Sequence, residues 1–424
     1  MKNILLFGAG KSATVLIDYL IAEAPGNNWN IIIADANKEQ IVAKTNNSPF
    51  TRAVQTDITD DSQRSKLIRQ AAIVISMMPP ALHFLIAKDC VEYKKNLLTA
   101  SYLDASIKSL QTEILNKKLL FICEMGLDPG IDHMSAMKII DGIKARSGIV
   151  TSFKSHCGGL VAPESDDNPW HYKISWNPRN VVNAGKAGAT YKLNDTIQHK
   201  DYKELFDNCP EVYIDGAGSL AAYPNRDSLG YLPVYKLENI KTFVRTTLRH
   251  PSFCVAWNAI AQAGLANEEH ILNAGELTFA KWSAPVIPFV NDSNRTLLEF
   301  AGIFDETLVP AKVKTSADIL QYLLETKLMM HPADKDMIVM LHEIEYEHSG
   351  ATIKIESSLV VKGTDHSRTA MAKTVGLPLG IAAKLILNGT LQLTGIHIPT
   401  IKEIYDPVLF ELEKAGISFT ERKL

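Results

Sequence analysis

Hydrophobic residues in the first 125 positions fall into short continuous runs separated by segments of helical periodicity. Strands are predicted at Ile4–Phe7, Ile31–Ala34, Ile73–Ser76, Asn96–Thr99 and Leu119–Cys123. Amphipathic stretches lie between them, for example Asp61–Gln70 and Leu82–Lys94, and the link RAVQTDITD is expected to carry one more strand. Strands that are apolar throughout alternate with helices in parallel, doubly wound sheets, so the pattern predicts an α/β domain.

Beyond residue 125 the pattern becomes mixed. The predicted elements are a helix over Asp132–Ala145, strands over Val150–Cys157 and Ala189–Leu193, and helices over His250–Ala263 and Ser316–Met330. The stretch from Gly158 to Ala189 is rich in Gly, Pro, Asn and Trp, and loops of that length in compact domains are usually functional. Residues 226–335 as a whole are expected to be largely helical.

Two strands and two helices complete the pattern. Residues 337–346 and 351–362 alternate like strands, and Ser349-Gly350 between them indicates a hairpin. The stretch Ser367–Asn388 is predicted to be a long apolar helix, and residues 403–417 an amphipathic one.

These elements predict two domains. Residues 1–125 are expected to form a parallel-sheet domain, with C-terminal helices at 385–424 returning to it. Residues 126–384 are expected to form an inserted α+β domain with a helical subdomain at about 226–335. A chain of 424 residues has room for two or three domains.

Composition narrows the class of protein. A hydrophobic content of 46% allows sizeable cores, and a formal net charge of −3 argues against a nucleic-acid partner. No apolar run is expected to be long enough to cross a membrane, and the first residues lead into glycines rather than a signal-peptide core. The five cysteines are scattered without a CxxC pair, which fits reduced thiols in a cytoplasmic protein. Cys157, beside two glycines, is either a buried filler or a site residue.

The first predicted strand leads directly into a glycine turn and a helix. The turn comprises Gly8, Ala9, Gly10, Lys11, Ser12 and Ala13. Gly8 would make the sharp bend, Gly10 would let the backbone approach a pyrophosphate, and Ala13 occupies the small position where strand and helix pack closely. Backbone N–H groups at the helix start would hold the phosphates.

Asp35 ends the second predicted strand. A carboxylate at that place can accept hydrogen bonds from ribose hydroxyls. With the glycine turn it predicts a bound nicotinamide dinucleotide, and the alternative is a structural turn without a ligand.

Polar and prolyl residues follow the third and fourth strands, at the edge where ligands bind in such sheets. Met78 and Pro79 lie in a rigid prolyl loop that would face the nicotinamide, or that simply ends the strand. Tyr102 could orient a carboxylate or relay a proton. Ser101 and Tyr102 are otherwise a helix N-cap and a packing residue.

The fifth strand ends in EMGLDPGIDH, where two glycines and a proline build a fixed turn. Asp128, Asp132 and His133 could act as acid, base or ammonium-binding groups, and Asp132 could cap the following helix. An Asp-Pro pair is also an ordinary turn, so the chemistry alone leaves the role of Asp128 open.

Basic residues form a second candidate cluster. They are Lys173, Arg179, Arg226, Arg245 and Arg249, near Trp176, Tyr223 and His250. Arginine suits bidentate carboxylate binding, and Arg226 is the strongest candidate because its loop is rigid and aromatic.

Metal binding and phosphoryl transfer are not indicated. The histidines lack ligand spacing, and HEIEYEH lies on a predicted strand rather than on an HExxH helix. Gly10-Lys11 lacks the spacing of a P-loop.

Several long motifs resemble one enzyme family, from the glycine turn to the last helix. They are GLDPGIDHM (126–134), HCGGLVAPE (156–164), NPWHYKISWNPR (168–179), YPNRDS (223–228) and the tail IAAKLIL with EIYDP. These segments look like saccharopine reductase, also called saccharopine dehydrogenase (L-glutamate-forming). The resemblance implies a Rossmann domain, a mixed substrate-binding and dimerisation domain, a helical part and a homodimer.

The resemblance also implies a reaction. L-glutamate and L-2-aminoadipate 6-semialdehyde would condense to an imine, and hydride from a nicotinamide would reduce it to saccharopine. Imine reduction needs an aligned hydride donor, a proton source and a dry site, but no covalent nucleophile.

The implied saccharopine site comprises Ser101, Tyr102, Asp128, Arg226, Thr247, Leu248 and Arg249. The implied cofactor contacts add Met78, Pro79, Ser101, Ile174, Ser175 and Trp176, the last three next to Lys173. Asp128 is placed by hypothesis near the secondary amine, Arg226 and Arg249 on carboxylates, and Tyr102 as a holding or relaying group. Asp128 and Tyr102 are therefore the catalytic candidates.

Two features depart from the family pattern. Fungal members commonly use NADP, with a basic residue after the second strand, whereas Asp35 would repel a 2′-phosphate and favours NAD. Lys38 lies close enough to attract a phosphate, which leaves NADP possible. His171 stands where the family tends to have glycine, and it is expected to reshape a loop.

Rival functions remain open. The nearest are sibling reductases on the same scaffold, of the carboxynorspermidine dehydrogenase or lysine 6-dehydrogenase type. A non-catalytic dinucleotide-binding protein would have no use for Asp128, Arg226 and Arg249 around the crevice.

Overall fold

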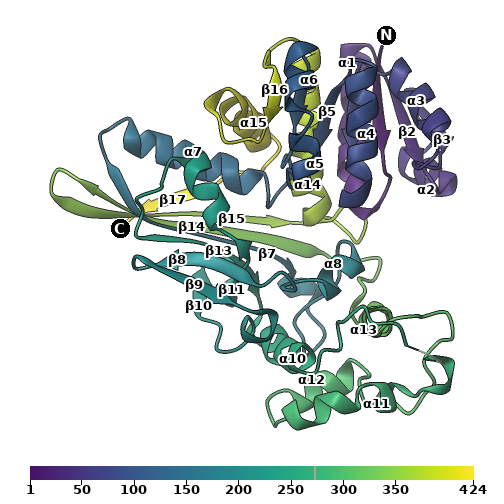
Figure 1. Ribbon diagram of the computed structural model, residues 1–424, viewed down its shortest axis with the longest axis vertical. Coiled ribbons are helices and arrows are strands. Elements are labelled where there is room, and N and C mark those ends of the chain that lie inside the picture. The colour runs from purple at the N-terminus through teal and green to yellow at the C-terminus, as the bar shows by residue number, and fades with distance from the viewer. Residues whose placement is uncertain (272–273) are drawn as a thin grey trace. The chain divides into compact units, whose positions relative to one another are not determined.

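The structure is a computed structural model that describes residues 1–271 and 274–424, which form two compact units (Figure 1). Unit 1 comprises Met1–Gly142 and Ser367–Ser418, and unit 2 comprises Ile143–His366 and Phe419–Leu424. The unit boundaries differ from the predicted ones. Most of α7 (Ile131–Lys144) belongs to unit 1, the return begins at 367 rather than 385, and the last six residues belong to unit 2.

Unit 1 is built on a seven-stranded, wholly parallel sheet with the order β16-β6-β5-β4-β1-β2-β3. Its strands are β1 (Lys2–Phe7), β2 (Trp29–Asp35), β3 (Thr51–Gln55), β4 (Ile73–Ser76), β5 (Asn96–Thr99), β6 (Leu120–Ile122) and β16 (Gly395–His397). All six strands expected before residue 125 are present, including the one in RAVQTDITD. The predicted Rossmann-type sheet is confirmed, and β16 adds a seventh strand that the pattern did not indicate.

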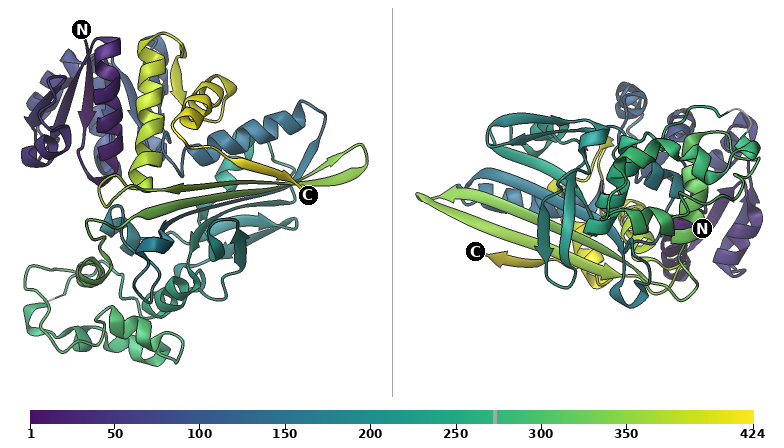
Figure 2. Two further views of the ribbon diagram at one scale, coloured as in Figure 1. Left: turned by 180° about the vertical axis from the view of Figure 1, so that it is seen from behind. Right: turned by 90° about the horizontal axis from the view of Figure 1, so that it is seen from below.

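Helices cover both faces of this sheet. The helices that lie wholly or mostly in unit 1 are η1 (Lys11–Ala13), α1 (Thr14–Asn27), α2 (Lys38–Thr45), α3 (Asp61–Gln70), α4 (Pro80–Glu92), α5 (Ala105–Lys108), α6 (Gln111–Asn116), α7, α14 (Ala370–Leu387) and α15 (Lys402–Lys414). Alternate strand residues such as Leu5, Val74 and Leu97 pack with the apolar residues of α3, α4 and α6. On the opposite face α1 and α14 lie side by side (Figure 2, left).

Helix α14 is long and apolar enough to cross a membrane by length and composition, which corrects the expectation that no such stretch exists. A core helix of a globular protein passes the same test, and 67% of the apolar window of α14 is buried. Gly376 and Gly380 face α1, because a Cβ at either position would lie within 3.0 Å of Leu16 or Tyr19. The helix is therefore part of the core of unit 1.

Unit 2 contains a ten-stranded mixed sheet whose main path is β10-β11-β13-β7-β14-β15-β17. Its strands are β7 (Ile149–Val161), β8 (Ala189–Leu193), β9 (Thr196–Lys200), β10 (Glu211–Ile214), β11 (Gly218–Pro224), β12 (Arg226–Asp227), β13 (Thr242–Arg249), β14 (Asp336–His348), β15 (Ala351–Lys362) and β17 (Thr420–Lys423). The predicted hairpin is present as β14 and β15. Ser349 and Gly350 both have positive φ, as a tight two-residue turn requires.

Short helices accompany the sheet of unit 2. They are η2 (Pro163–Ser165), α8 (Pro178–Val182), η3 (Tyr202–Glu204), η4 (Leu229–Tyr231), α9 (Leu232–Tyr235), α10 (Pro251–Gln262), η5 (Ala274–Glu276), α11 (Phe279–Trp282), η6 (Ala284–Phe289), α12 (Arg295–Phe300) and α13 (Ser316–Leu328). The range 226–335 is thus less helical than expected, since it also holds β12 and β13, and its residues 272–273 lie outside the described part of the chain.

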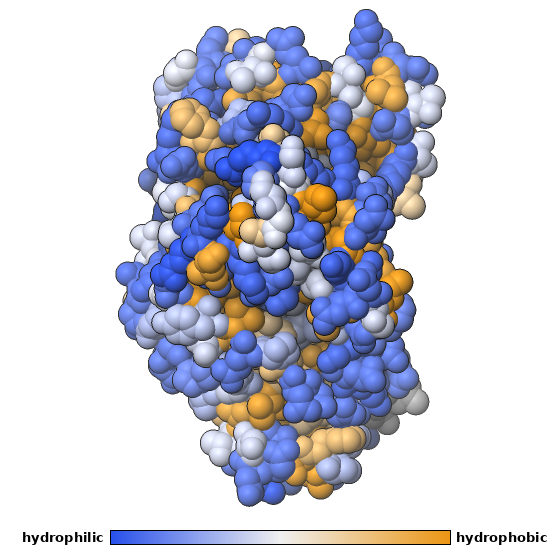
Figure 3. Space-filling view, turned by 90° about the vertical axis from the view of Figure 1, so that its left-hand side faces the viewer, coloured by the Kyte–Doolittle hydropathy of each residue, from blue (hydrophilic) through white to orange (hydrophobic). Residues whose placement is uncertain are grey.

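Adjacent residues of β11 face opposite sides of this sheet. Ala221 and Tyr223 pack with the helices, whereas Leu220 and Ala222 join a second apolar cluster that includes Leu248. Hydrophilic side chains dominate the surface shown in Figure 3, and the hydrophobic ones lie singly or in small groups between them, as on most globular proteins.

Candidate active site

Gly8, the first residue of the glycine turn of unit 1, has the sharp bend expected of a dinucleotide-binding turn. Gly8 has φ +96°, and its N–H donates to the carbonyl of Ala34 at 2.9 Å. A Cβ at Gly8 would lie 2.9 Å from the carbonyl oxygen of Met77, so a side chain is excluded by both conformation and space. This glycine is required by the fold itself.

Gly10 is a glycine for a different reason. Its backbone has an extended conformation, φ −62° and ψ −177°, that any residue could adopt. No heavy atom lies within 4 Å of the position that its Cβ would occupy. The open space lies in front of η1 and α1, where N–H groups of a helix start can bind phosphate, so the turn fits a dinucleotide pyrophosphate.

The carboxylate of Asp35 is held by the backbone around the turn. One oxygen accepts from the N–H of Ala9 at 2.7 Å, and the other accepts from the N–H of Asn37 at 2.9 Å. A carboxylate has further lone pairs, so Asp35 can still accept a ribose hydroxyl.

Lys44, on α2, is a further cation at the cradle that the sequence did not single out. Its Nζ donates to the carbonyl of Gly10 at 2.5 Å and to Oγ1 of Thr14 at 2.8 Å. Burial lowers the pKa of Lys44 to about 8, against the opposing effect of Asp35 and Asp18. Sequence reasoning missed Lys44 because its contacts with Gly10 and Thr14 join segments about 30 residues apart in the chain.

The prolyl loop follows β4. Pro79 precedes α4, whose first residue is Pro80, as is common at helix starts. The sulfur of Met78 lies 3.4 Å from the position that a Cβ on Gly8 would occupy. The structure therefore brings the predicted cofactor residues Gly8 and Met78 together.

A buried histidine links the ends of β4 and β5. Nδ1 of His83 lies 2.8 Å from Oγ of Ser76, and Nε2 lies 2.7 Å from Oγ of Ser101 and 3.3 Å from Oγ1 of Thr99. Ser101 and Tyr102 are both half-buried after β5. Sequence reasoning missed His83 because a lone histidine in a helix carries no spacing signal.

The turn 124–133 is fixed by buried polar groups. One oxygen of Glu124 accepts from the N–H of Leu103 at 3.0 Å, and the other lies 2.9 Å from Nε2 of His133. Asp132 accepts from the N–H of Gly130 at 2.6 Å. Asp132 and His133 are buried and hold the turn, whereas Asp128 is half-buried and remains the acid of this turn with solvent access.

In unit 2, Arg249 at the end of β13 is the most unusual charged residue. The residue is 4% exposed, and its guanidinium lies over the rings of Tyr172 at 5.2 Å and Phe253 at 5.5 Å. Nη1 donates to the carbonyl of Leu248 at 2.8 Å, but Nε has no acceptor and no carboxylate pairs with Arg249 within the described residues. A buried cation without an anion is unfavourable, so the site fits a ligand carboxylate.

Thr247 and Tyr223 lie beside Arg249 on the same face of the sheet. They form a cross-strand pair between β13 and β11. Burial raises the pKa of Tyr223 to about 12, so its hydroxyl stays protonated. Leu248 points to the other face and is buried in the second apolar cluster, so only its backbone belongs with Thr247 and Arg249.

The segment Lys173–Trp176 lies mostly inside unit 2. The N–H of Ile174 donates to the carbonyl of Leu328 at 2.7 Å, and Ser175 is also buried. Lys173 is held by Asp167 at 2.8 Å and Asp334 at 2.7 Å. Trp176 is partly buried and its Nε1 donates to the hydroxyl of Tyr172 at 3.4 Å, which places it next to the Arg249 group.

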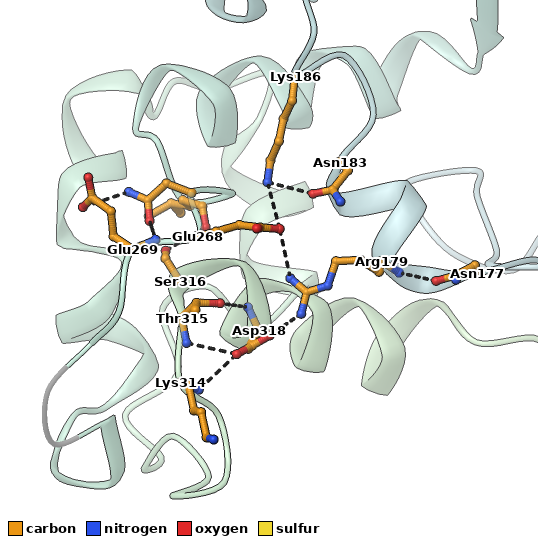
Figure 4. A network of polar contacts seen from close by, with 12 residues as sticks. Asn177, Arg179, Asn183, Lys186, Glu268, Glu269, Lys314, Thr315, Ser316 and Asp318 are labelled. Carbon is orange, nitrogen blue, oxygen red and sulfur yellow. Dashed lines mark hydrogen bonds and ion pairs between the residues drawn. The ribbon is translucent and has the colours of Figure 1, made fainter. Parts of the chain in front are cut away.

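The other arginines of the predicted basic cluster lie in settings that differ from that of Arg249, and their grouping into one site stays a prediction. Arg179 pairs with Asp318 and lies 4.0 Å from Glu268, in a network that ties α8 to α13 (Figure 4). Arg245 is buried with its guanidinium 4.7 Å from the ring centre of Tyr231. Arg226 is exposed on β12 with φ +54°.

His171 keeps the backbone that a glycine would have. Its φ is +48°, in the left-handed region that favours glycine. Its ring lies against the ring of His250 at a tilt of 37° with centroids 3.9 Å apart, and Nδ1 lies 2.6 Å from Asp166. The backbone conformation of His171 is therefore one that glycine adopts readily, and the reshaping of the loop stays a prediction.

Across residues 1–271 and 274–424, no group of three or more His, Cys, Asp or Glu side chains could hold a metal ion. The stretch HEIEYEH lies on β14, as expected. All five cysteines are free thiols, and Cys157 is buried.

Comparison with known proteins decides the family. Residues 4–121 match the saccharopine dehydrogenase NADP binding domain, and residues 126–417 match the saccharopine dehydrogenase C-terminal domain. The chain belongs to the saccharopine dehydrogenase family. The resemblance expected from the motifs is confirmed.

Two curated relatives show which members of this family the chain is similar to. It is 33% identical over 447 residues to bovine mitochondrial alpha-aminoadipic semialdehyde synthase, covering 99% of this chain and 47% of that protein. The chain thus spans about half the length of that relative. It is 31% identical to saccharopine dehydrogenase [NADP(+), L-glutamate-forming] of Saccharomyces cerevisiae, covering 99% of both.

Solved structures agree on the fold. Apo saccharopine dehydrogenase (L-Glu forming) from Saccharomyces cerevisiae superposes with a TM-score of 0.89 and 30% identity over 100% of both chains. A homospermidine synthase from Legionella pneumophila in complex with NAD gives a TM-score of 0.59 over 100% of this chain and 91% of that one. At 8% identity that second likeness shows the fold alone.

Proposed function

We propose that the protein is an NAD(P)-dependent oxidoreductase that acts on the secondary amine of saccharopine and forms L-glutamate and L-2-aminoadipate 6-semialdehyde, reversibly and by way of an imine. The observation that carries the proposal is the full-length likeness to the yeast L-glutamate-forming enzyme, which covers 99% of both chains. The physiological role would lie in lysine metabolism.

The cofactor side of the reaction would be supplied by unit 1. Gly8 fixes the turn, Gly10 leaves space for the pyrophosphate, and η1 and α1 offer helix-start N–H groups. A bound nicotinamide dinucleotide accepts or donates the hydride. Ser101 and Met78, after β5 and β4, are the proposed contacts near its reactive end.

The substrate side needs anion-binding and amine-binding groups. Saccharopine carries three carboxylates, and Arg249 with its unsatisfied Nε is the group in unit 2 best suited to one of them. Thr247 and Trp176 lie beside it. We assign Asp128 to the secondary amine and Tyr102 to holding or relaying a proton. Arg226, exposed on β12, is assigned to a second carboxylate.

The choice between NAD and NADP belongs to the same proposal. Asp35 disfavours a 2′-phosphate, and we propose NAD as the preferred cofactor on that ground. The printed names of the yeast relative and of the matching domain contain NADP, and Lys38 and Lys44 are nearby cations that would favour it. Both dinucleotides therefore belong in the test.

We also propose a cytoplasmic homodimer. The scattered reduced thiols support the compartment, and the family resemblance supports the dimer. Size measurement in solution tests the second point.

The test is oxidation of saccharopine by the purified protein with NAD or NADP, followed by absorbance of the reduced cofactor. Turnover with NAD supports the proposal together with the role of Asp35. Turnover with NADP alone keeps the enzyme and removes the Asp35 argument. Binding of dinucleotide without turnover of saccharopine would contradict the function and direct the search to the sibling amines.

A further inference from the structure

The buried imidazole of His83 is the centre of a hydroxyl network, and the histidine itself has no role in the proposed chemistry. His83 lies in the first turn of α4 and is 2% exposed. Its two nitrogens lie within hydrogen-bonding distance of Ser76 at the end of β4, and of Thr99 and Ser101 at and after the end of β5. The ring therefore connects two neighbouring strands where ligands bind in a doubly wound sheet.

The ring is neutral near pH 7. Burial lowers the pKa of His83 to about 4, against the opposing effect of the carboxylate of Asp104. A neutral imidazole has one donor nitrogen and one acceptor nitrogen, so the hydrogen bonds of the network have a fixed direction.

The surrounding hydroxyls are compatible with Nε2 as the acceptor. Oγ1 of Thr99 accepts from the N–H of Ser101 at 3.2 Å, and its own hydrogen can point to Nε2 of His83. The hydroxyl of Ser101 lies closer to Nε2, at 2.7 Å against 3.3 Å for Thr99, so it is the main donor in this arrangement. Nδ1–H then donates to Ser76, and we take this tautomer as part of the proposal to be tested.

The backbone of Ser101 is held by bonds that do not include His83. Its N–H donates to Oγ1 of Thr99, and its carbonyl accepts from the N–H of Glu124 at 2.9 Å. Of Ser101 itself, the hydroxyl is the group that contacts the histidine. If that hydroxyl donates to Nε2, its lone pairs are left to accept a hydrogen bond from outside the network.

We propose that His83 is a positioning residue that orients the Ser101 hydroxyl as a hydrogen-bond acceptor for an N–H group of the bound ligand. Two sources of such a group exist under the proposed function, on which this inference rests. They are the carboxamide of the nicotinamide and the amines of saccharopine. His83 itself does not touch the ligand.

Four variants test the role of the ring. His83→Asn keeps a polar atom near Nδ1 and removes the acceptor at Nε2, whereas His83→Gln can place its carbonyl oxygen near Nε2. We expect His83→Asn to weaken either dinucleotide binding or the KM for saccharopine about tenfold, and His83→Gln to stay within about threefold of wild type. Ser101→Ala should cause a loss similar to that of His83→Asn. His397→Asn, at a half-exposed histidine of β16, should change neither constant.

The double variant His83→Asn/Ser101→Ala measures the coupling. We expect the double variant to bind the ligand as well as either single variant does, because the two substitutions remove the same hydrogen bond. Additive losses would overturn the proposal. A His83→Asn protein that binds both ligands like wild type would overturn it as well.

Nitrogen-15 NMR of histidine-labelled wild type tests the direction of the bonds without relying on any variant. The His83 signal, assigned through His83→Gln, should show a neutral ring protonated on Nδ1 at pH 7. A ring protonated on Nε2 would overturn the proposal. If wild type fails to oxidise saccharopine, the proposed function fails separately, and an unchanged dinucleotide affinity in His83→Asn then overturns this inference too.

Discussion

Gly8 and Gly10 stand in one turn but meet different constraints. Gly8 cannot carry a side chain in the folded protein, because its φ is +96° and Met77 is too close. Gly10 could carry one without touching the protein. The absence of a side chain at Gly10 is therefore explained by the ligand rather than by the fold.

Gly10→Ala should separate cofactor binding from stability. We expect an unchanged melting temperature and at least a tenfold loss of dinucleotide affinity, because the added methyl group occupies the space left for the pyrophosphate. Gly26→Ala, at an open position of α1, is the matched control and should retain full affinity. Calorimetric titration with NAD and NADP measures the effect, and unchanged affinity in Gly10→Ala would argue against the cradle.

Arg249→Met should separate substrate binding from stability in a similar way. Removing a buried, unpaired guanidinium should leave the melting temperature unchanged or raise it. The KM for saccharopine should rise about 30-fold or more, since a desolvated carboxylate loses its partner. Arg295→Met, at an exposed position of α12, is the control. A KM equal to wild type would remove Arg249 from the site.

Lys44 gives a pH-dependent signature. The pKa of Lys44 is about 8 in the folded state and about 10.5 in the unfolded state. Between these two values the unfolded state binds more protons than the folded state. The contribution of Lys44 to the free energy of unfolding therefore rises with pH over this range. The melting temperature of Lys44→Met relative to wild type should therefore be higher at pH 7 than at pH 10. Lys38→Met, at the start of the same helix, serves as the control. A difference that grows toward pH 10 would contradict the assignment.

For single residues, the sequence predicted those whose position follows from a strand end and missed those whose role depends on contacts between distant segments. Position after a strand was enough to place Ser101 and Tyr102 at the sheet edge. Contacts between distant segments were not readable, so His83 was missed. The same limit made Arg179 look like a ligand group, although it pairs with Asp318 in the fold.

At the level of helices and strands, the elements that could be predicted are those whose burial produces a clear hydrophobic pattern in the sequence. The strands of unit 1 are continuous apolar runs, because helices cover both faces, and all the predicted ones are present. In unit 2, β13 was missed because polar residues such as Arg245 and Thr247 interrupt its pattern. Strand β17, TERK, is exposed at every position and is defined only by pairing with β15.

The packing of α14 on α1 depends on glycine. A Cβ on Gly380 would lie 2.5 Å from Cδ1 of Tyr19, so Gly380→Ala should lower stability by about 1–3 kcal/mol. Gly26→Ala, in a helix with open space around the residue, should instead raise it by about 0.5–1 kcal/mol. Thermal unfolding measures both. Equal stability of Gly380→Ala and wild type would show that the two helices are less tightly packed than described.

At the level of the whole molecule, the sequence predicted two domains and the return of the C-terminal segment. The predicted bounds, 125 and 385, differ from those of the compact units, which change at 142 and 367, because most of α7 and all of α14 pack within unit 1. Helical periodicity shows which face of α14 is apolar but not which core it enters. The homodimer and the compartment stay predictions.

The central claim is that this chain cleaves saccharopine on the side that releases glutamate. The most direct measurement uses saccharopine labelled with nitrogen-15 at the secondary amine, a nicotinamide dinucleotide and product analysis by mass spectrometry. We predict labelled glutamate in equal amount with the reduced cofactor, because the nitrogen leaves with glutamate when the imine is hydrolysed. Labelled lysine with 2-oxoglutarate, or no product from protein that binds the dinucleotide, would contradict the account.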